Sequence, residues 1–126
     1  MSEIPATMRQ IQSLVTPEGE LRLSLATVPT PQPGEREVLV RVEAAPINPS
    51  DLLVLLAMAD VSAAVGGGSA EEPVVTAPIS EPAMRSLAAR VGEAMTVGIE
   101  GSGVVVAAGQ STEAQSLLGR ADGFLG

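Results

Sequence analysis

The chain has 126 residues, a length that suits one domain, and a formal charge of −8. The acids are scattered and all seven basic residues are arginines, which argues against nucleic-acid binding and against docking on an anionic membrane. The absence of cysteine and histidine excludes disulfides, thiolate and Ser-His-Asp catalysis, and Cys/His zinc sites. Neither a secretory leader nor a membrane-spanning apolar run is recognisable, so we expect a cytoplasmic protein.

The first 28 residues predict a β-hairpin. Met8–Val15 alternates weakly between polar and apolar residues, and residues 16–19 (Thr-Pro-Glu-Gly) have the composition of a tight turn. In the following segment, Glu20–Val28, three leucines at every second position would share one face of a strand: Leu21, Leu23 and Leu25.

A proline-rich stretch, residues 29–34, separates this hairpin from the clearest strand of the sequence, Glu37–Ala45. Proline cannot donate to a central β-ladder, so the stretch is predicted to be an extended loop. Valines at alternate positions of Glu37–Ala45 indicate a strand with a β-branched face.

The segment that follows this strand, Pro-Ile-Asn-Pro-Ser-Asp, has the features of a helix start. Asn48 is the expected cap, with Ser50 as the alternative, and Pro49 suits the first helical position. Asp51 would lie in the first turn, where a negative charge favours the helix dipole. The helix itself would be short and mostly apolar, covering Leu52–Ala59.

The second half of the chain combines short helices with two extended segments. Val65–Glu72, which contains Gly66–Gly68, is expected to be a flexible loop, and Glu71–Ile79 is expected to be extended. Ser80 would cap a helix that ends at Gly92, with three apolar residues on one face: Met84, Leu87 and Val91. Ser102–Ala108 is predicted to be a buried strand and Thr112–Leu118 a two-turn helix, whereas residues 120–126 show no clear pattern. Together these elements predict a mainly β domain, a partly open barrel with short helices.

Two glycine clusters invite a nucleotide-binding interpretation, which their context disfavours. Gly98–Gly103 has the order G-x-x-G-x-G and precedes a strand, whereas a dinucleotide fingerprint requires G-x-G-x-x-G before a helix. Gly66–Gly68 lacks the Lys-Ser/Thr of a phosphate loop. We therefore interpret these glycines as turn residues, or as positions where strands approach closely.

Three segments in this order resemble the medium-chain dehydrogenase/reductase superfamily. They read IQSLVTPEGELRLSL, PTPQPGEREVLVRVEAAPINPSD and VGIEGSGVVVAAG, and the resemblance covers residues 9–119. It is greatest to the N-terminal GroES-like domain of the zinc-independent quinone reductase and 2-enoyl thioester reductase branch. The resemblance implies one GroES-like domain over residues 1–126, with the NADPH-binding Rossmann domain absent from this chain.

The resemblance also implies a site. In the zinc-independent branch the residue at Asn48 lies near nicotinamide and substrate, and its amide donates to a carbonyl or enolate oxygen. Asp51 would fix the turn, and Glu100 with its neighbouring glycines would shape the floor of the substrate cleft. Zinc-dependent relatives have a cysteine at Asn48 and a histidine at Ile99, so we expect no bound metal. From the residues alone, Asn48 as a plain helix cap stays an equal alternative.

Two departures from the family leave the function open. Enoyl reductases use a tyrosine shortly after this segment as proton donor, and this chain has no tyrosine. A dinucleotide motif is absent as well, so we expect no NADPH binding and no turnover by this chain alone. The first hypothesis is the substrate lobe of a quinone or α,β-unsaturated carbonyl reductase that works with a nucleotide-binding domain, in cis or in trans. The alternative is a non-catalytic truncated product or interaction module, for which we expect an exposed apolar face and a homodimer.

Overall fold

The computed structural model describes residues 3–125, which form two compact units. One unit contains Arg9–Val28 and Ile47–Val97 and is called here the five-stranded unit; the other contains, within the described chain, residues 3–8, 29–46 and 98–125 and is called the three-stranded unit. Strands predominate, the helices are short and both sheets are open, which confirms the prediction of a mainly β, partly open fold.

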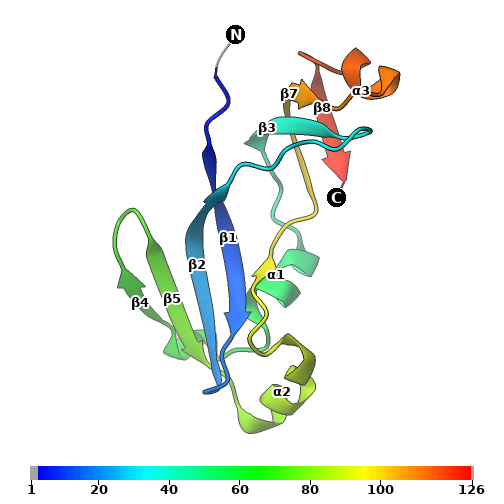
Figure 1. The fold of residues 1–126 in the computed structure, drawn as a ribbon. Coiled ribbons are helices and arrows are strands. Elements are labelled where there is room, and N and C mark those ends of the chain that lie inside the picture. The colour runs from blue at the N-terminus through cyan, green and yellow to red at the C-terminus, as the bar shows by residue number, and fades with distance from the viewer. Residues whose placement is uncertain (1–2, 126) are drawn as a thin grey trace. The chain divides into compact units, whose positions relative to one another are not determined.

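The sheet of the five-stranded unit has the strand order β4-β5-β2-β1-β6 (Figure 1). These strands are β1 (Thr7–Val15), β2 (Glu20–Pro29), β4 (Val65–Gly68), β5 (Pro73–Pro78) and β6 (Met95–Thr96). The predicted hairpin is confirmed, because β1 and β2 are neighbours joined by a turn in which the Gly19 N–H donates to the Thr16 carbonyl at 3.1 Å. Gly19 has a φ of 89°, a left-handed conformation that favours glycine.

The core of this unit gathers on one face of β2. Leu21 and Val15 are fully buried and pack with Ala57, Ile79 and Ala83, and Leu23 packs against this cluster. Two helices and two 3₁₀ turns complete the unit: α1 (Pro49–Leu56), η1 (Val61–Ala63), α2 (Glu81–Ser86) and η2 (Ala88–Arg90). Met84, Leu87 and Val91 all pack against the same cluster, as predicted, although only Met84 lies within α2.

The three-stranded unit has the sheet order β3-β7-β8 and the helix α3 (Thr112–Ser116). Its strands are β3 (Val38–Ala44), β7 (Glu100–Ala108) and β8 (Ala121–Leu125), and both neighbouring pairs are antiparallel. Gly103 lets β3 and β7 approach closely, because an added Cβ there would lie 2.0 Å from the carbonyl oxygen of Arg41. The strand begins at Glu100, two residues before the predicted Ser102, so Gly101 and Gly103 lie within it, and the predicted close approach of strands is confirmed at Gly103.

Three sequence expectations were wrong in detail. The loop expected at Val65–Glu72 begins as the strand β4, because Val65–Gly68 pairs with Pro73–Thr76 of β5 through backbone groups that need no side chain. The patternless tail forms β8, an exposed edge strand whose pairing with β7 is non-local. The helix expected to reach Gly92 ends at Ser86, and the Gly92 N–H donates instead to the Val15 carbonyl at 2.9 Å.

The first helix also differs from its expected range. It begins at Pro49 and ends at Leu56, three residues before the expected end. Ala57 and Met58 take positive φ values of 47° and 60°, which stop the helix. The Asp60 N–H then donates to the Pro78 carbonyl at 2.9 Å, so the chain is held at the end of β5.

Candidate functional site

Asn48 is the N-cap of α1, as the sequence predicts, with Pro49 at the first helical position. Its backbone is extended, with φ −99° and ψ 155°, which the following proline favours. Asn48 and Asp51 form a capping box in which the Asn48 N–H donates to Oδ2 of Asp51 at 2.9 Å. The structure therefore brings these two candidate residues together at one end of one helix.

The side chains of Asn48 and Asp51 differ in solvent exposure. Asp51 is 8 % exposed, whereas Asn48 is half-buried and Ile47 beside it is 84 % exposed. A carboxylate that is buried and bonded to the backbone serves to hold the turn. Asn48 is therefore the more accessible of the two candidate side chains at this helix N-terminus.

The opposite end of α1 is held by two residues that the sequence analysis did not single out. The Ser13 hydroxyl of β1 lies within hydrogen-bonding distance of two carbonyl oxygens in the last turn, Val54 at 3.1 Å and Leu55 at 2.9 Å. Arg90 donates from Nη1 to the Val54 carbonyl and from Nη2 to the Ser13 hydroxyl, both at 3.1 Å. In the sequence, Arg90 could be recognised only as an arginine near the end of a predicted helix. Its partners Val54 and Ser13 lie 36 and 77 residues away in the chain, so no local pattern indicates them.

The guanidinium of Arg90 is partly buried among neutral groups. Burial lowers the pKa of its guanidinium, and its Nε is buried without a hydrogen-bond partner in the described chain. Its partners are neutral, but they include the carbonyl end of α1, where the helix dipole favours a positive charge. Arg90 thus fixes the direction of α1, and with it the position of the capped N-terminus.

Glu100, the third candidate, belongs to the three-stranded unit and is described with that unit alone. It is the first residue of β7, is half-buried, and pairs in register with Leu125 of β8. Gly101 beside it could not take a side chain without movement, because a Cβ would lie 2.8 Å from the Phe124 ring and 3.2 Å from the Ala44 carbonyl oxygen. Close strand packing thus accounts for this glycine.

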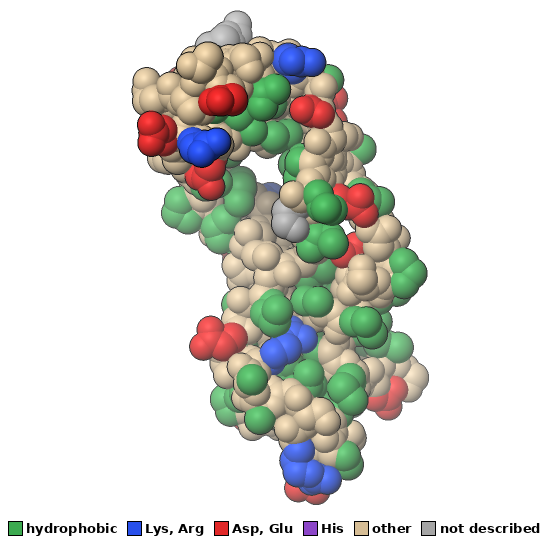
Figure 2. All heavy atoms as spheres, turned by 90° about the vertical axis from the view of Figure 1, so that its right-hand side faces the viewer, with side chains coloured by type: hydrophobic (Ala, Val, Ile, Leu, Met, Phe, Trp, Pro, Cys, Tyr) green, Lys and Arg blue, Asp and Glu red, His purple; other side chains and the backbone are tan. Residues whose placement is uncertain are grey.

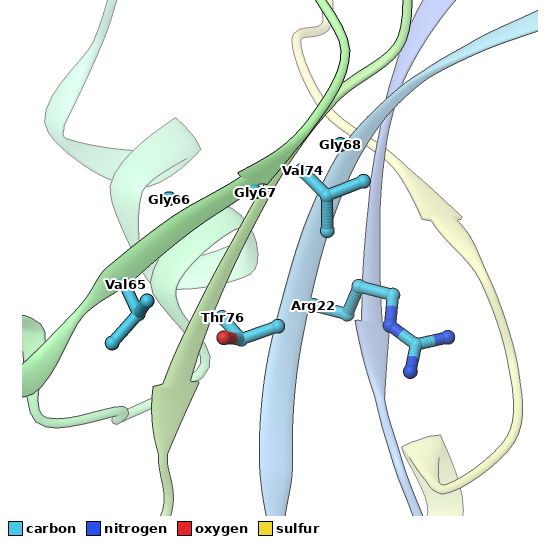
Figure 3. Close-up of a pocket in the computed structure, with 7 residues that line it drawn as sticks. All are labelled: Arg22, Val65, Gly66, Gly67, Gly68, Val74 and Thr76. Carbon is cyan, nitrogen blue, oxygen red and sulfur yellow. The ribbon is translucent and has the colours of Figure 1, made fainter.

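A separate hollow of about 380 Å³ lies on the sheet of the five-stranded unit (Figure 3). Its lining comes from β2, β4 and β5: Arg22, Val65, Gly66, Gly67, Gly68, Val74 and Thr76. Arg22 pairs in register with Thr76, which pairs with Val65, so these three residues form a row across three strands. This hollow contains neither Asn48 nor Asp51.

Apolar side chains are exposed around α1. Ile47 is 84 % exposed, Leu53 79 % and Met58 65 %. Figure 2 shows hydrophobic side chains over much of the face that it presents of the five-stranded unit, with few charges between them. An apolar surface of this kind is typical of a face that contacts another protein surface.

The described part of the chain offers neither a cluster of metal ligands nor a membrane-spanning helix. Among residues 3–125, no group of three or more Asp and Glu side chains is close enough to hold a metal ion. In the same part of the chain, no helix has both the length and the apolar character that a bilayer crossing requires.

Comparison with known proteins yields a partial match. The chain matches no family model. It is 47% identical over 47 residues to a zinc-type alcohol dehydrogenase-like protein of Schizosaccharomyces pombe, a stretch that covers 36% of this chain and 14% of that relative. The match supports a relationship to the medium-chain dehydrogenase/reductase superfamily. It thereby supports an oxidoreductase-family origin for the chain.

Proposed function

We propose that this chain is the substrate-side lobe of an NADPH-dependent oxidoreductase that reduces quinones or α,β-unsaturated carbonyls. The observation that carries the proposal is the partial match to a dehydrogenase-like protein. Asn48, the residue to which the resemblance assigns the substrate contact, lies at the N-terminus of α1. The quinone or enone substrate and the NADPH preference come from the resemblance alone.

Asn48 is the residue proposed to act on the substrate. Reduction of a carbonyl or a conjugated enone places negative charge on the carbonyl oxygen, and a donor positioned at that oxygen stabilises the transition state. Asp51 orients Asn48 through its bond to the Asn48 N–H at 2.9 Å, and Glu100 is proposed to line the cleft. The chain has no tyrosine, so the proton donor is proposed to lie outside residues 1–126.

The cofactor is proposed to bind to another domain. The sequence contains no G-x-G-x-x-G, so the residues present do not fit a dinucleotide, and we derive no step through it. The exposed apolar residues of α1 and of the turn after it, among them Leu53 and Met58, form the surface that we propose meets the nucleotide-binding domain. We propose that the reaction is zinc-independent, because no cysteine or histidine is available as a ligand.

A binding experiment tests the role of Asn48. Titration of the ¹⁵N-labelled chain with menadione and with cyclohex-2-enone should shift the amide resonances around Asn48. Asn48→Ser is the informative variant, because serine also caps a helix but lacks the amide donor. We expect its fold to be retained and its affinity to fall about tenfold, the loss of roughly one hydrogen bond. Equal affinity of both proteins, or no shift near α1, would exclude the proposed site.

A turnover experiment tests the assignment of the cofactor to another domain. The purified chain with NADPH and menadione should show no loss of absorbance at the NADPH band beyond the rate without protein. Steady turnover by the chain alone would contradict the proposal that NADPH binds to another domain. No turnover together with no substrate binding would favour the alternative, a non-catalytic interaction module.

A further inference from the structure

We infer that a pocket in the three-stranded unit binds a neutral, mainly apolar small molecule that carries one hydroxyl or carbonyl group. The pocket has a volume of about 300 Å³, and all the residues that line it belong to this unit. They come from the segment before β1, the proline-rich loop after β2, and the strands β3 and β7: residues 4–6, residues 30–33, Leu39 and Ala107. The inference does not depend on the proposed enzymatic function, whose candidate residues lie outside this pocket.

The sheet contributes an apolar cross-strand pair to the pocket. Leu39 of β3 and Ala107 of β7 lie directly opposite each other in the antiparallel ladder, so their side chains share one face of the sheet. Both residues are half-buried. Because the alanine side chain is small, the pair leaves room for the apolar part of a ligand beside Leu39.

Thr30 holds together the two chain segments that complete the pocket. Its N–H donates to the Ala6 carbonyl at 3.0 Å, and its hydroxyl donates to the Pro5 carbonyl at 2.7 Å. Pro5, Pro31 and Pro33 fix their own φ angles and restrict the residue before each of them. The pocket is therefore formed before a ligand arrives, and little conformational entropy is lost on binding.

The side chains that line the pocket determine the class of ligand. Among residues 3–125 no charged residue lines it, so a charged ligand would lose hydration without gaining an opposite charge. The prolines of the lining have no N–H, and the Thr30 hydroxyl already donates to Pro5. Gln32 is exposed, and within the described part of the chain its amide has no hydrogen-bond partner. This amide can donate to a hydroxyl or carbonyl oxygen of the ligand.

The volume of the pocket limits the size of the ligand. An apolar cavity of roughly 150 Å³ holds benzene, so a pocket of about 300 Å³ has room for a molecule of two fused rings. The pocket is open to solvent, since Ile4 in its wall is 40 % exposed. We therefore expect weak binding of such a molecule, with a Kd of about 1 mM.

Titration of the ¹⁵N-labelled chain with 2-naphthol tests the inference, because this probe is neutral and has two rings and one hydroxyl. We expect saturable shifts of the amide resonances of Ala6, Leu39 and Ala107, and none around α1. Naphthalene-2-sulfonate has the same rings but carries a charge, and it should bind about tenfold more weakly. Equal binding of the two probes, or no saturable shift at the pocket with 2-naphthol, would overturn the inference.

Two substitutions test the residues assigned to the ligand. Gln32→Ala removes the amide at an exposed position, so the fold should be retained and the Kd for 2-naphthol should rise about fivefold. Ala107→Val adds bulk to the apolar pair, and valine suits a strand, so binding should weaken without a lower midpoint of thermal unfolding.

Gln110→Ala is the matched control for Gln32→Ala. Gln110 is an exposed glutamine of the same unit and does not line the pocket. We expect this variant to bind 2-naphthol with the Kd of the wild-type chain. The inference is overturned if Gln32→Ala and Ala107→Val both bind as tightly as the wild-type chain, or if Gln110→Ala weakens binding as much as Gln32→Ala.

Discussion

The carboxylate of Asp51 accepts a hydrogen bond from the backbone N–H of Asn48 at 2.9 Å, and this bond closes the N-terminus of α1. Asp51→Ala removes it and leaves an N–H without its partner. We expect the free energy of unfolding to fall by about 1 kcal/mol, the usual contribution of a helix cap. Urea denaturation followed by circular dichroism measures this change.

Glu81→Ala is the control for Asp51, because Glu81 is an acid in the first turn of α2 with an exposed side chain. Only its interaction with the helix dipole is lost, so we expect a change below about 0.5 kcal/mol. An equal effect of both substitutions would mean that the capping box contributes nothing beyond the charge.

Arg90 joins the C-terminal turn of α1 to β1. Arg90→Ala removes two donors at 3.1 Å and exposes the Val54 carbonyl to an unfilled space. Since charged donors contribute more than neutral ones and Arg90 is only partly buried, we expect a loss of about 2 kcal/mol in thermal or urea unfolding.

Arg85→Ala is the matched control for Arg90, five residues earlier and exposed, in the last turn of α2. We expect it to be neutral within about 0.5 kcal/mol. Arg90→Lys is also informative, because lysine keeps the charge but cannot reach both partners; a fully stable lysine variant would show that charge alone is sufficient.

Leu21 and Leu53 test the position of the core. Leu21 is 1 % exposed, so Leu21→Ala leaves a cavity and should cost about 2–5 kcal/mol in denaturant unfolding. Leu53 is 79 % exposed, so Leu53→Ala should be nearly neutral in the isolated chain. A large loss at Leu53 would mean that this side chain is covered in solution.

Gly103 and Gly66 test the close approach of β3 and β7. At Gly103 an added Cβ would lie 2.0 Å from the Arg41 carbonyl oxygen, so Gly103→Ala must push the two strands apart. At Gly66 there is open space, so Gly66→Ala should be tolerated. Thermal unfolding should show a lowered midpoint for the first variant and an unchanged one for the second.

Local patterns in the sequence predicted most of the elements. Alternating leucines in β2, valines in β3 and the Asn-Pro cap of α1 were read correctly, because each depends on neighbours within a few residues. The strands β4 and β8 were missed, because glycine-rich or exposed edge strands carry no alternation and form only when a partner strand is present.

In the candidate site, too, some features follow from local sequence and others depend on non-local contacts. The sequence by itself determined the cap at Asn48, the turn role of Asp51 and the absence of cysteine and histidine ligands, since these follow from residue identity and local backbone preference. Only the tertiary structure decided that Ser13 and Arg90 hold the far end of α1, and that β4 presents an unpaired edge. The partners of Arg90 lie 36 and 77 positions away from it in the sequence. Such contacts leave no local sequence pattern, because only folding brings the residues together.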